Sequence, residues 1–256
     1  MARVWKLHGF VAAALLLHLT VGAALAQDVY VEQKVEMSAM GGQPPTQMLV
    51  KIWFTPDKMR IDQPLGGGTT VIMRTDQDKM YILNQAAKTY VDQSLEAAKS
   101  SAAAAATMMG GEKMQVEVKP TGTEKKIGEW NCKQYLLTVT GGVPITMEIW
   151  TTTDLKIDPN LYSKMSDAMG ANPLMTPLTE KIKSIPGYPV QTVMKMPLGG
   201  QVVETTSTVQ KISQDTIAPT EFNIPEGYTK MEAPAAAPAP AAPGAPAAPA
   251  PKKGGS

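Results

Sequence analysis

Alternation of apolar and polar side chains is the feature that most limits what this chain can fold into. From residue 29 to 37, Val29, Val31, Val35 and Met37 alternate with mainly polar side chains. The segment 48–54 repeats the pattern. A period of two places one kind of side chain on each face of a strand. Short segments of this type, separated by glycine-rich and other tight turns, predict an antiparallel meander.

The remaining elements follow from the same pattern and from capping residues. Helices are expected over 95–109 and 160–169, and a third begins at Thr176-Pro177, because Asp, Ser or Thr followed by Pro or Glu suits a helix start. The fold class is therefore mainly β (α+β), with two or three helices. Further strands are expected over 57–63, 69–75, 78–84, 88–93, 113–119, 123–127, 131–140, 144–152, 188–196 and 202–213.

The first 26 residues have the pattern of a Sec-type signal peptide. Arg3 and Lys6 precede an apolar run over 10–19, and small residues stand at Ala24 and Ala26. Cleavage is expected after Ala26, which places the mature protein in the periplasm or outside the cell. The alternative is a membrane anchor, but the run is shorter than the roughly 20 residues that span a bilayer.

Two further segments follow from composition. Residues 27–232 form one β-rich domain, and residues 233–256 form a tail in which only Ala, Pro and Gly occur up to residue 251. Such a tail buries too little apolar area to order itself and is expected to be disordered. It serves either as a solubilising segment or as a spacer that brings Lys252 and Lys253 to an acidic envelope surface.

The residues available for chemistry are few. Both histidines, His8 and His18, lie in the signal peptide. The mature chain therefore lacks the imidazole needed for histidine-based triads and for most zinc and iron sites. A carboxylate pair remains formally open, but no Asp/Glu pair stands out. We therefore expect no enzyme, no cofactor and no metal.

Charge and cysteine content argue against a nucleic-acid-binding function and against a reactive thiol. Outside residues 1–26 the chain has 22 basic and 23 acidic side chains, and its arginines are Arg60 and Arg74. Nucleic-acid binding needs a basic surface, so it is not expected. Cys132 is the single cysteine. It is expected to be a buried, inert thiol, with a reactive or intermolecular thiol as the alternative.

Several motifs, taken in order, resemble a known family. They are the stretches 54–62 (FTPDKMRID), 78–84 (DKMYILN), 128–135 (GEWNCKQY) and 222–228 (FNIPEGY). Their order and spacing are similar to those of an uncharacterised bacterial family, a domain of unknown function of the 4412 type. The resemblance covers roughly residues 28–230.

This family looks like the LolA/LolB-like superfamily of periplasmic lipoprotein carriers. The resemblance implies a strongly curved antiparallel sheet, a half-open barrel with covering helices, and a concave surface for acyl chains or another amphiphile. The leading hypothesis is a non-enzymatic binding or carrier protein for a lipid-like or lipoprotein-derived apolar ligand. The residues expected to line its site are Met48, Val50, Ile52, Met114, Val116, Met147, Ile149, Leu161 and Met165.

Two other functions remain open at this point. The chain could be a structural or interaction module of the envelope, whose sheet edge or Ala/Pro tail binds a partner protein. It could also bind Cu(I), because thioethers select this ion and methionines stand close together at Met37 and Met40, Met108 and Met109, and Met194 and Met196.

Overall fold

The computed structural model describes residues 28–39, 44–108, 115–141, 144–157, 176–198 and 200–232. The expected signal peptide, the Ala/Pro tail and the helix expected over 160–169 lie outside these ranges. The described chain is mostly β-sheet, with α1 (Leu95–Met108) and α3 (Thr176–Lys183) as its α-helices. The expected mainly β class is confirmed.

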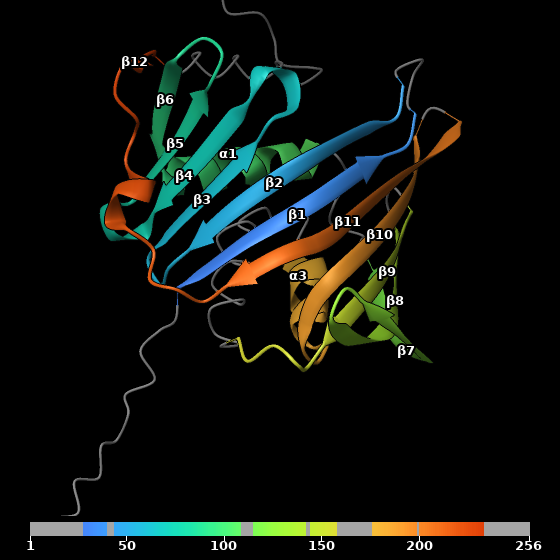
Figure 1. The fold of residues 1–256 in the computed structure, drawn as a ribbon. Coiled ribbons are helices and arrows are strands. Elements are labelled where there is room, and N and C mark those ends of the chain that lie inside the picture. The colour runs from blue at the N-terminus through green and yellow to red at the C-terminus, as the bar shows by residue number, and fades with distance from the viewer. Residues whose placement is uncertain are drawn as a thin grey trace, which may run out of the picture.

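One curved sheet contains all twelve strands of the described residues (Figure 1). Its order is β12-β6-β5-β4-β3-β2-β1-β11-β10-β9-β8-β7, so that two meanders meet where β1 pairs with β11. The strands are β1 (Val29–Met37), β2 (Thr46–Phe54), β3 (Lys58–Gln63), β4 (Thr69–Arg74), β5 (Lys79–Asn84), β6 (Thr89–Ser94), β7 (Gln115–Ile127), β8 (Trp130–Thr140), β9 (Ile145–Thr152), β10 (Tyr188–Leu198), β11 (Gln201–Ser213) and β12 (Thr229–Lys230).

Two strands differ from the sequence expectation. The segments 113–119 and 123–127 are not separate strands, because the single strand β7 spans Gln115–Ile127 with a register shift between Pro120 and Glu124. A bulge accommodates the extra residues, and Gly122 there has a φ of 77°. The final strand, β12, pairs in parallel with β6, whereas every other strand pair of the described sheet is antiparallel.

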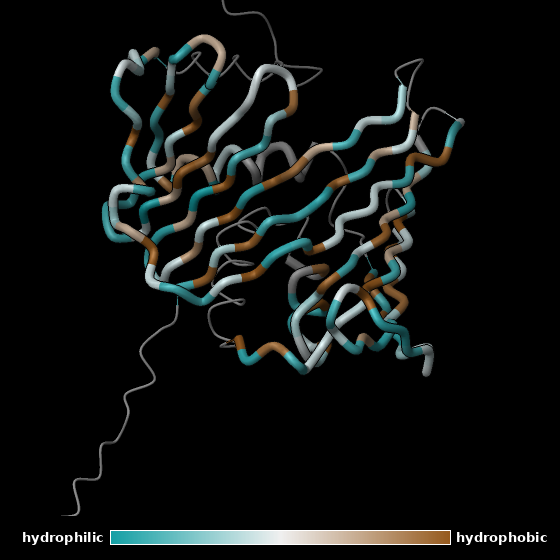
Figure 2. The backbone as a smooth tube through the Cα atoms, in the orientation of Figure 1, coloured by the Kyte–Doolittle hydropathy of each residue, from teal (hydrophilic) through white to brown (hydrophobic). Residues whose placement is uncertain are grey.

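The two faces of the sheet are covered by different segments. Helices α1 and α3 lie on one side, behind the strands in Figure 1. On the other side residues 214–228, which we call the C-terminal strap, pass from β11 to β12 and include the short helix η4 (Pro219–Phe222). Figure 2 shows hydrophobic and hydrophilic residues alternating along the strands, the pattern of an antiparallel sheet with one packed face and one face that is largely exposed to solvent.

A partly buried polar network joins the strap to the sheet. Arg60 donates to both carboxylate oxygens of Asp62 at 2.9 Å and to the backbone carbonyl of Glu221 at 2.9 Å. Its guanidinium also lies 5.0 Å from the ring centroid of Trp53. Thr70 donates to Asp62 at 2.8 Å. These bonds connect segments 161 residues apart and fix the strap against β3.

Removing the arginine of this network has a predictable cost. Arg60→Met is expected to lower the free energy of unfolding by about 2 kcal/mol, because it leaves Asp62 largely buried without its counter-ion. Arg74→Met is the matched control, since Arg74 makes the same bidentate pair with Asp76 at a turn, where an ion pair contributes less than about 1 kcal/mol. Urea unfolding midpoints measure both, and equal losses would contradict the role given to the strap.

Candidate functional site

Six of the nine residues expected to line a ligand site lie in the described part of the chain. Met114, Leu161 and Met165 fall outside it. The register of the strands places the six on one face of the sheet, because alternate residues of a strand, and directly paired residues of neighbouring strands, share a face. A transverse row on this face runs through Met48, Val35, Ser207, Thr192 and Ile149.

The other expected residues join this row by two-residue steps. Val50 and Ile52 follow Met48 along β2, and Met147 precedes Ile149 along β9. Val116 belongs to the same face because it pairs with Val139, which pairs in turn with a β9 residue on that face. We call this face the helix-side face. Its contact with a ligand stays a prediction.

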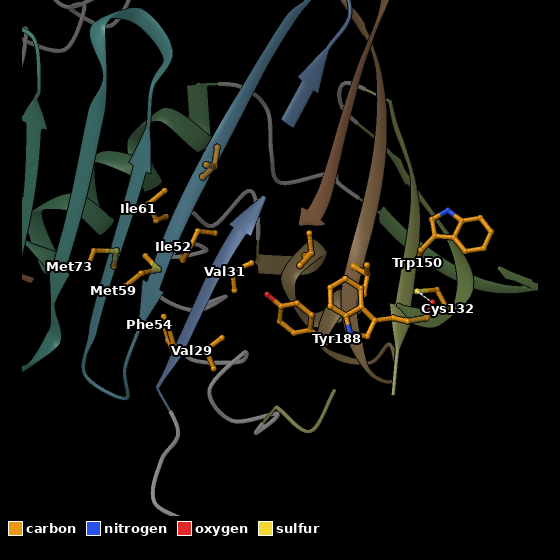
Figure 3. Close-up of a cluster of buried hydrophobic side chains, with 14 residues drawn as sticks. Val29, Val31, Ile52, Phe54, Met59, Ile61, Met73, Cys132, Trp150 and Tyr188 are labelled. Carbon is orange, nitrogen blue, oxygen red and sulfur yellow. Dashed lines mark hydrogen bonds between the residues drawn. The ribbon is translucent and has the colours of Figure 1, made fainter. Parts of the chain in front are cut away.

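The helix-side face carries two apolar clusters. The first contains Val50, Ile52 and Phe54 from β2, together with residues from β1, β3 and β4 that Figure 3 labels: Val29, Val31, Met59, Ile61 and Met73. The second contains Ile149, Leu137 and Val139 under α3. Between them, Met48, Val35 and Thr192 are only half-buried. The middle of the face is therefore less tightly covered than its two ends.

Helix α3 covers the second cluster with a small number of side chains. Leu178, Ile182 and the following Ile185 pack against Leu137, Val139 and Ile149. The helix is eight residues long and ends before Pro186-Gly187, which cannot continue it. A helix this short is marginal on its own, so its position depends on these apolar contacts.

A groove of about 470 Å³ opens where β7, β8 and β9 meet the turn after α3. This volume lies within the range of about 300–1,000 Å³ that is typical of small-molecule sites. Residues from three strands and the turn line it, including Lys126, Lys133, Tyr135, Thr151, Asp154 and Pro186. Tyr135 pairs directly with Ile149, and Lys133 pairs with Thr151. The groove therefore continues the helix-side face beyond the end of α3.

Charged side chains surround this groove unevenly. Lys133 lies 3.4 Å from Glu124, and both side chains are 67% exposed. Lys125 lies 3.9 Å from the ring centroid of Trp150 and donates to Gln191 at 2.9 Å. Within the described ranges, Lys126 has no ion-pair partner. These contacts leave positive charge at the rim.

The acidic groups of the groove bind the protein's own donors. Asp154 accepts hydrogen bonds from the backbone N–H of Asn131 at 2.9 Å and from its side-chain amide at 3.3 Å. The backbone bond is the largest influence that holds the pKa of Asp154 below its usual value, followed by the side-chain bonds. Asp154 is therefore ionised at neutral pH, and its Oδ2 accepts both bonds from Asn131.

Cys132 lies beneath this groove and is buried. Burial raises the pKa of its thiol, and its Sγ lies 3.6 Å from the carbonyl oxygen of Trp130. A thiol in this state is a poor nucleophile. Figure 3 shows Cys132 between the strands, close to Trp150. This placement agrees with the expected buried thiol.

Other residue types that carry chemistry are not gathered in the part of the chain that the structure describes. No group of three His, Cys, Asp or Glu side chains there is placed to hold a metal ion. Met194 pairs with Met147 across β10 and β9, and Met196 follows on the same face, whereas Met40 and Met109 lie outside the described ranges. Among the described helices, none combines the length and apolarity needed to cross a membrane.

Residues 34–228 match the model of a family described as a domain of unknown function, DUF4412. The chain belongs to the DUF4412 family. This match confirms the resemblance seen in the sequence motifs. No curated protein matches this DUF4412 chain.

Solved structures similar to this DUF4412 protein include three of different kinds. The LolA superfamily protein NE2245 from Nitrosomonas europaea is 8% identical, with a TM-score of 0.35 over 77% of this chain and 90% of that one. The MucA/MucB complex of Pseudomonas aeruginosa is 10% identical, with a TM-score of 0.38 over 77% of this chain and 56% of that one. PNGF-II is 15% identical, with a TM-score of 0.37 over 81% of this chain and 31% of that one. This chain therefore spans about a third of the length of the PNGF-II structures.

Some residues of the site could not be recognised in the sequence. Lys126, Lys133 and Tyr135 read as ordinary strand residues, because charges on an exposed strand usually face solvent. Only the pairing of β7 with β8, and of β8 with β9, brings them around one groove. The sequence signal for them is indirect, namely the Gly128 turn that folds β8 back onto β7.

Proposed function

We propose that this protein is a non-catalytic binding protein for an amphiphilic ligand, acting in the periplasm or outside the cell. The observation that carries this proposal is the groove next to α3. It opens on the helix-side face next to the apolar cluster that α3 covers. Tyr135, which lines the groove, pairs with Ile149 of that cluster. A ligand that inserts an apolar chain beneath α3 while its polar end stays in the groove would use both surfaces.

Further support comes from the sequence. The signal pattern of residues 1–26 supports export, and the absence of histidine from residues 27–256 argues against most acid–base chemistry. Half-buried methionines at Met48, Met147 and Met194 supply flexible, polarizable contacts that suit ligands of varied shape. In this proposal α3 is a cover that shifts to admit the apolar chain.

The interaction-module alternative has weaker support in the described strands. The exposed edge strand β7 contains Pro120, a bulge and several lysines. Features of this kind prevent an edge strand from pairing with a strand of another molecule. A ligand site on the helix-side face therefore accounts for more of the structure than an adhesive edge does.

The experiment begins with the protein as purified under mild conditions. Mass spectrometry of an organic extract is expected to recover a co-bound amphiphile, and the emptied protein is expected to bind a fluorescent fatty-acid probe. Met147→Gln should weaken probe binding about tenfold, because a half-buried apolar contact is replaced by a polar one of similar length. Leu49→Gln is the control, since Leu49 is exposed on the opposite face. An empty extract together with no probe binding would refute the proposal.

A further inference from the structure

We infer that the groove beside α3 receives an anionic group, the carboxylate or phosphate end of the amphiphile. The inference rests on the proposed function and adds the chemical class of the ligand's polar end. It also assigns that end to a specific place, the rim formed by Lys126 and Lys133.

The charges of the groove carry the inference. Three lysines and two acids line it. Asp154 is occupied by the backbone and side-chain N–H groups of Asn131, and Glu124 is paired with Lys133 at 3.4 Å. Within the described chain Lys126 keeps no acidic partner, and the three lysines of the lining outnumber its two acids, so the charges that line the groove sum to a net positive charge. A negatively charged group is the complement of this arrangement.

Neutral donors add to the cations. Thr151 near the end of β9 and Thr153 just after it line the groove, as does Asn131, whose side-chain amide also donates to Asp154. Hydroxyl and amide donors commonly accompany lysine where a carboxylate or phosphate oxygen is bound. The groove is partly enclosed, so a charge pair in it is screened less than a pair on an open surface.

The position of the groove also fits an amphiphile whose charged group is at one end. Thr151 and Ile149 are two residues apart on β9, which corresponds to about 7 Å along a strand. Leu137 and Val139 continue the apolar surface from Tyr135 along β8. A ligand whose charge sits beside Lys126 thus has its first apolar carbons at the edge of the cluster under α3.

The test compares ligands of equal chain length that differ at the polar end. The measurement is displacement of a fluorescent probe from the full-length mature protein. The competing ligands are oleate, 1-oleoyl-lysophosphatidate and methyl oleate, each used below its critical micelle concentration. Both anions are expected to bind at least about tenfold more tightly than the ester, and the tighter of the two identifies a carboxylate or a phosphate as the preferred group. Raising the salt concentration should weaken the anions and leave the ester unchanged.

Variants then locate the contact. Lys126→Glu should weaken both anions about tenfold or more and leave methyl oleate unaffected, with Lys126→Gln intermediate. Lys119→Gln is the matched control, because Lys119 is also exposed on β7 but pairs with Leu136 on the opposite face. Unchanged urea unfolding midpoints show that the variants fold, since Lys126 is exposed.

The outcomes separate this inference from the proposed function. Equal affinity for the anions and the ester, or an unaltered affinity in Lys126→Glu, would overturn the inference while the binding function stands. Failure of the wild-type protein to bind the probe or any of the three ligands would overturn both.

Discussion

Phe222→Ala is expected to lower the free energy of unfolding by about 3–5 kcal/mol, the usual cost of truncating a fully buried phenylalanine. Phe222 is 2% exposed and is the main anchor of the C-terminal strap. It packs with Ile217 against Ile72 and Leu83, on the face opposite the helices. The truncation removes apolar contact and leaves a cavity, because the sheet beneath cannot collapse to fill it.

Urea unfolding of Phe222→Ala and of a matched variant measures this effect. Leu65→Ala is the control, because Leu65 is 47% exposed and its truncation should change stability by less than about 0.5 kcal/mol. Limited proteolysis should also cut Phe222→Ala within residues 214–228 sooner than the wild type. A loss below about 1 kcal/mol would mean that the strap contributes little to the fold.

Gly187→Ala is expected to cost about 3 kcal/mol, from two sources that add. Gly187 has a φ of 87°, a left-handed conformation that costs other residues roughly 1–2 kcal/mol. A Cβ at this position would also lie 2.5 Å from the backbone oxygen of Thr152, so that the β9–β10 pairing must shift. Overpacking of this kind adds about 1–3 kcal/mol.

A second glycine separates the two sources. Gly227 has a φ of 81°, but an added Cβ would meet nothing within 4 Å, so Gly227→Ala should cost only about 1–2 kcal/mol. Because Gly187 joins α3 to β10, its replacement should also loosen α3, and hydrogen exchange of Ile182 and Ile185 should become faster. If the two variants lose the same free energy of unfolding, β9 moves away from the added Cβ without a measurable energetic cost.

The local patterns of the chain were sufficient to predict most strands. Apolar residues recur at every second position along β1 and β2 irrespective of their neighbours, and this period is a property of the strand itself. The same pattern placed Met48, Val50 and Ile52 on one face. The segment around Pro120 was predicted less well, because a proline and a glycine end a strand in most sequences and are absorbed here by a bulge.

The candidate site depends on contacts that no local pattern contains. Tyr135 and Lys126 meet at one groove only because β8 pairs with both β7 and β9. The bond from Arg60 to the carbonyl of Glu221 likewise joins residues 161 positions apart. Such contacts are decided by how the sheet curves and which strands become neighbours, which local periodicity does not encode.

The sequence by itself determined the β class, the faces of individual strands, the DUF4412 membership and the lack of histidine outside residues 1–26, because each of these is a property of residues read in order. Only the tertiary structure decided that β1 joins two meanders, that a strap covers one face and that lysines gather beside α3. The physical reason is that long-range pairing arises from packing the whole sheet, and apolar surface can be buried against any complementary segment that the chain can reach.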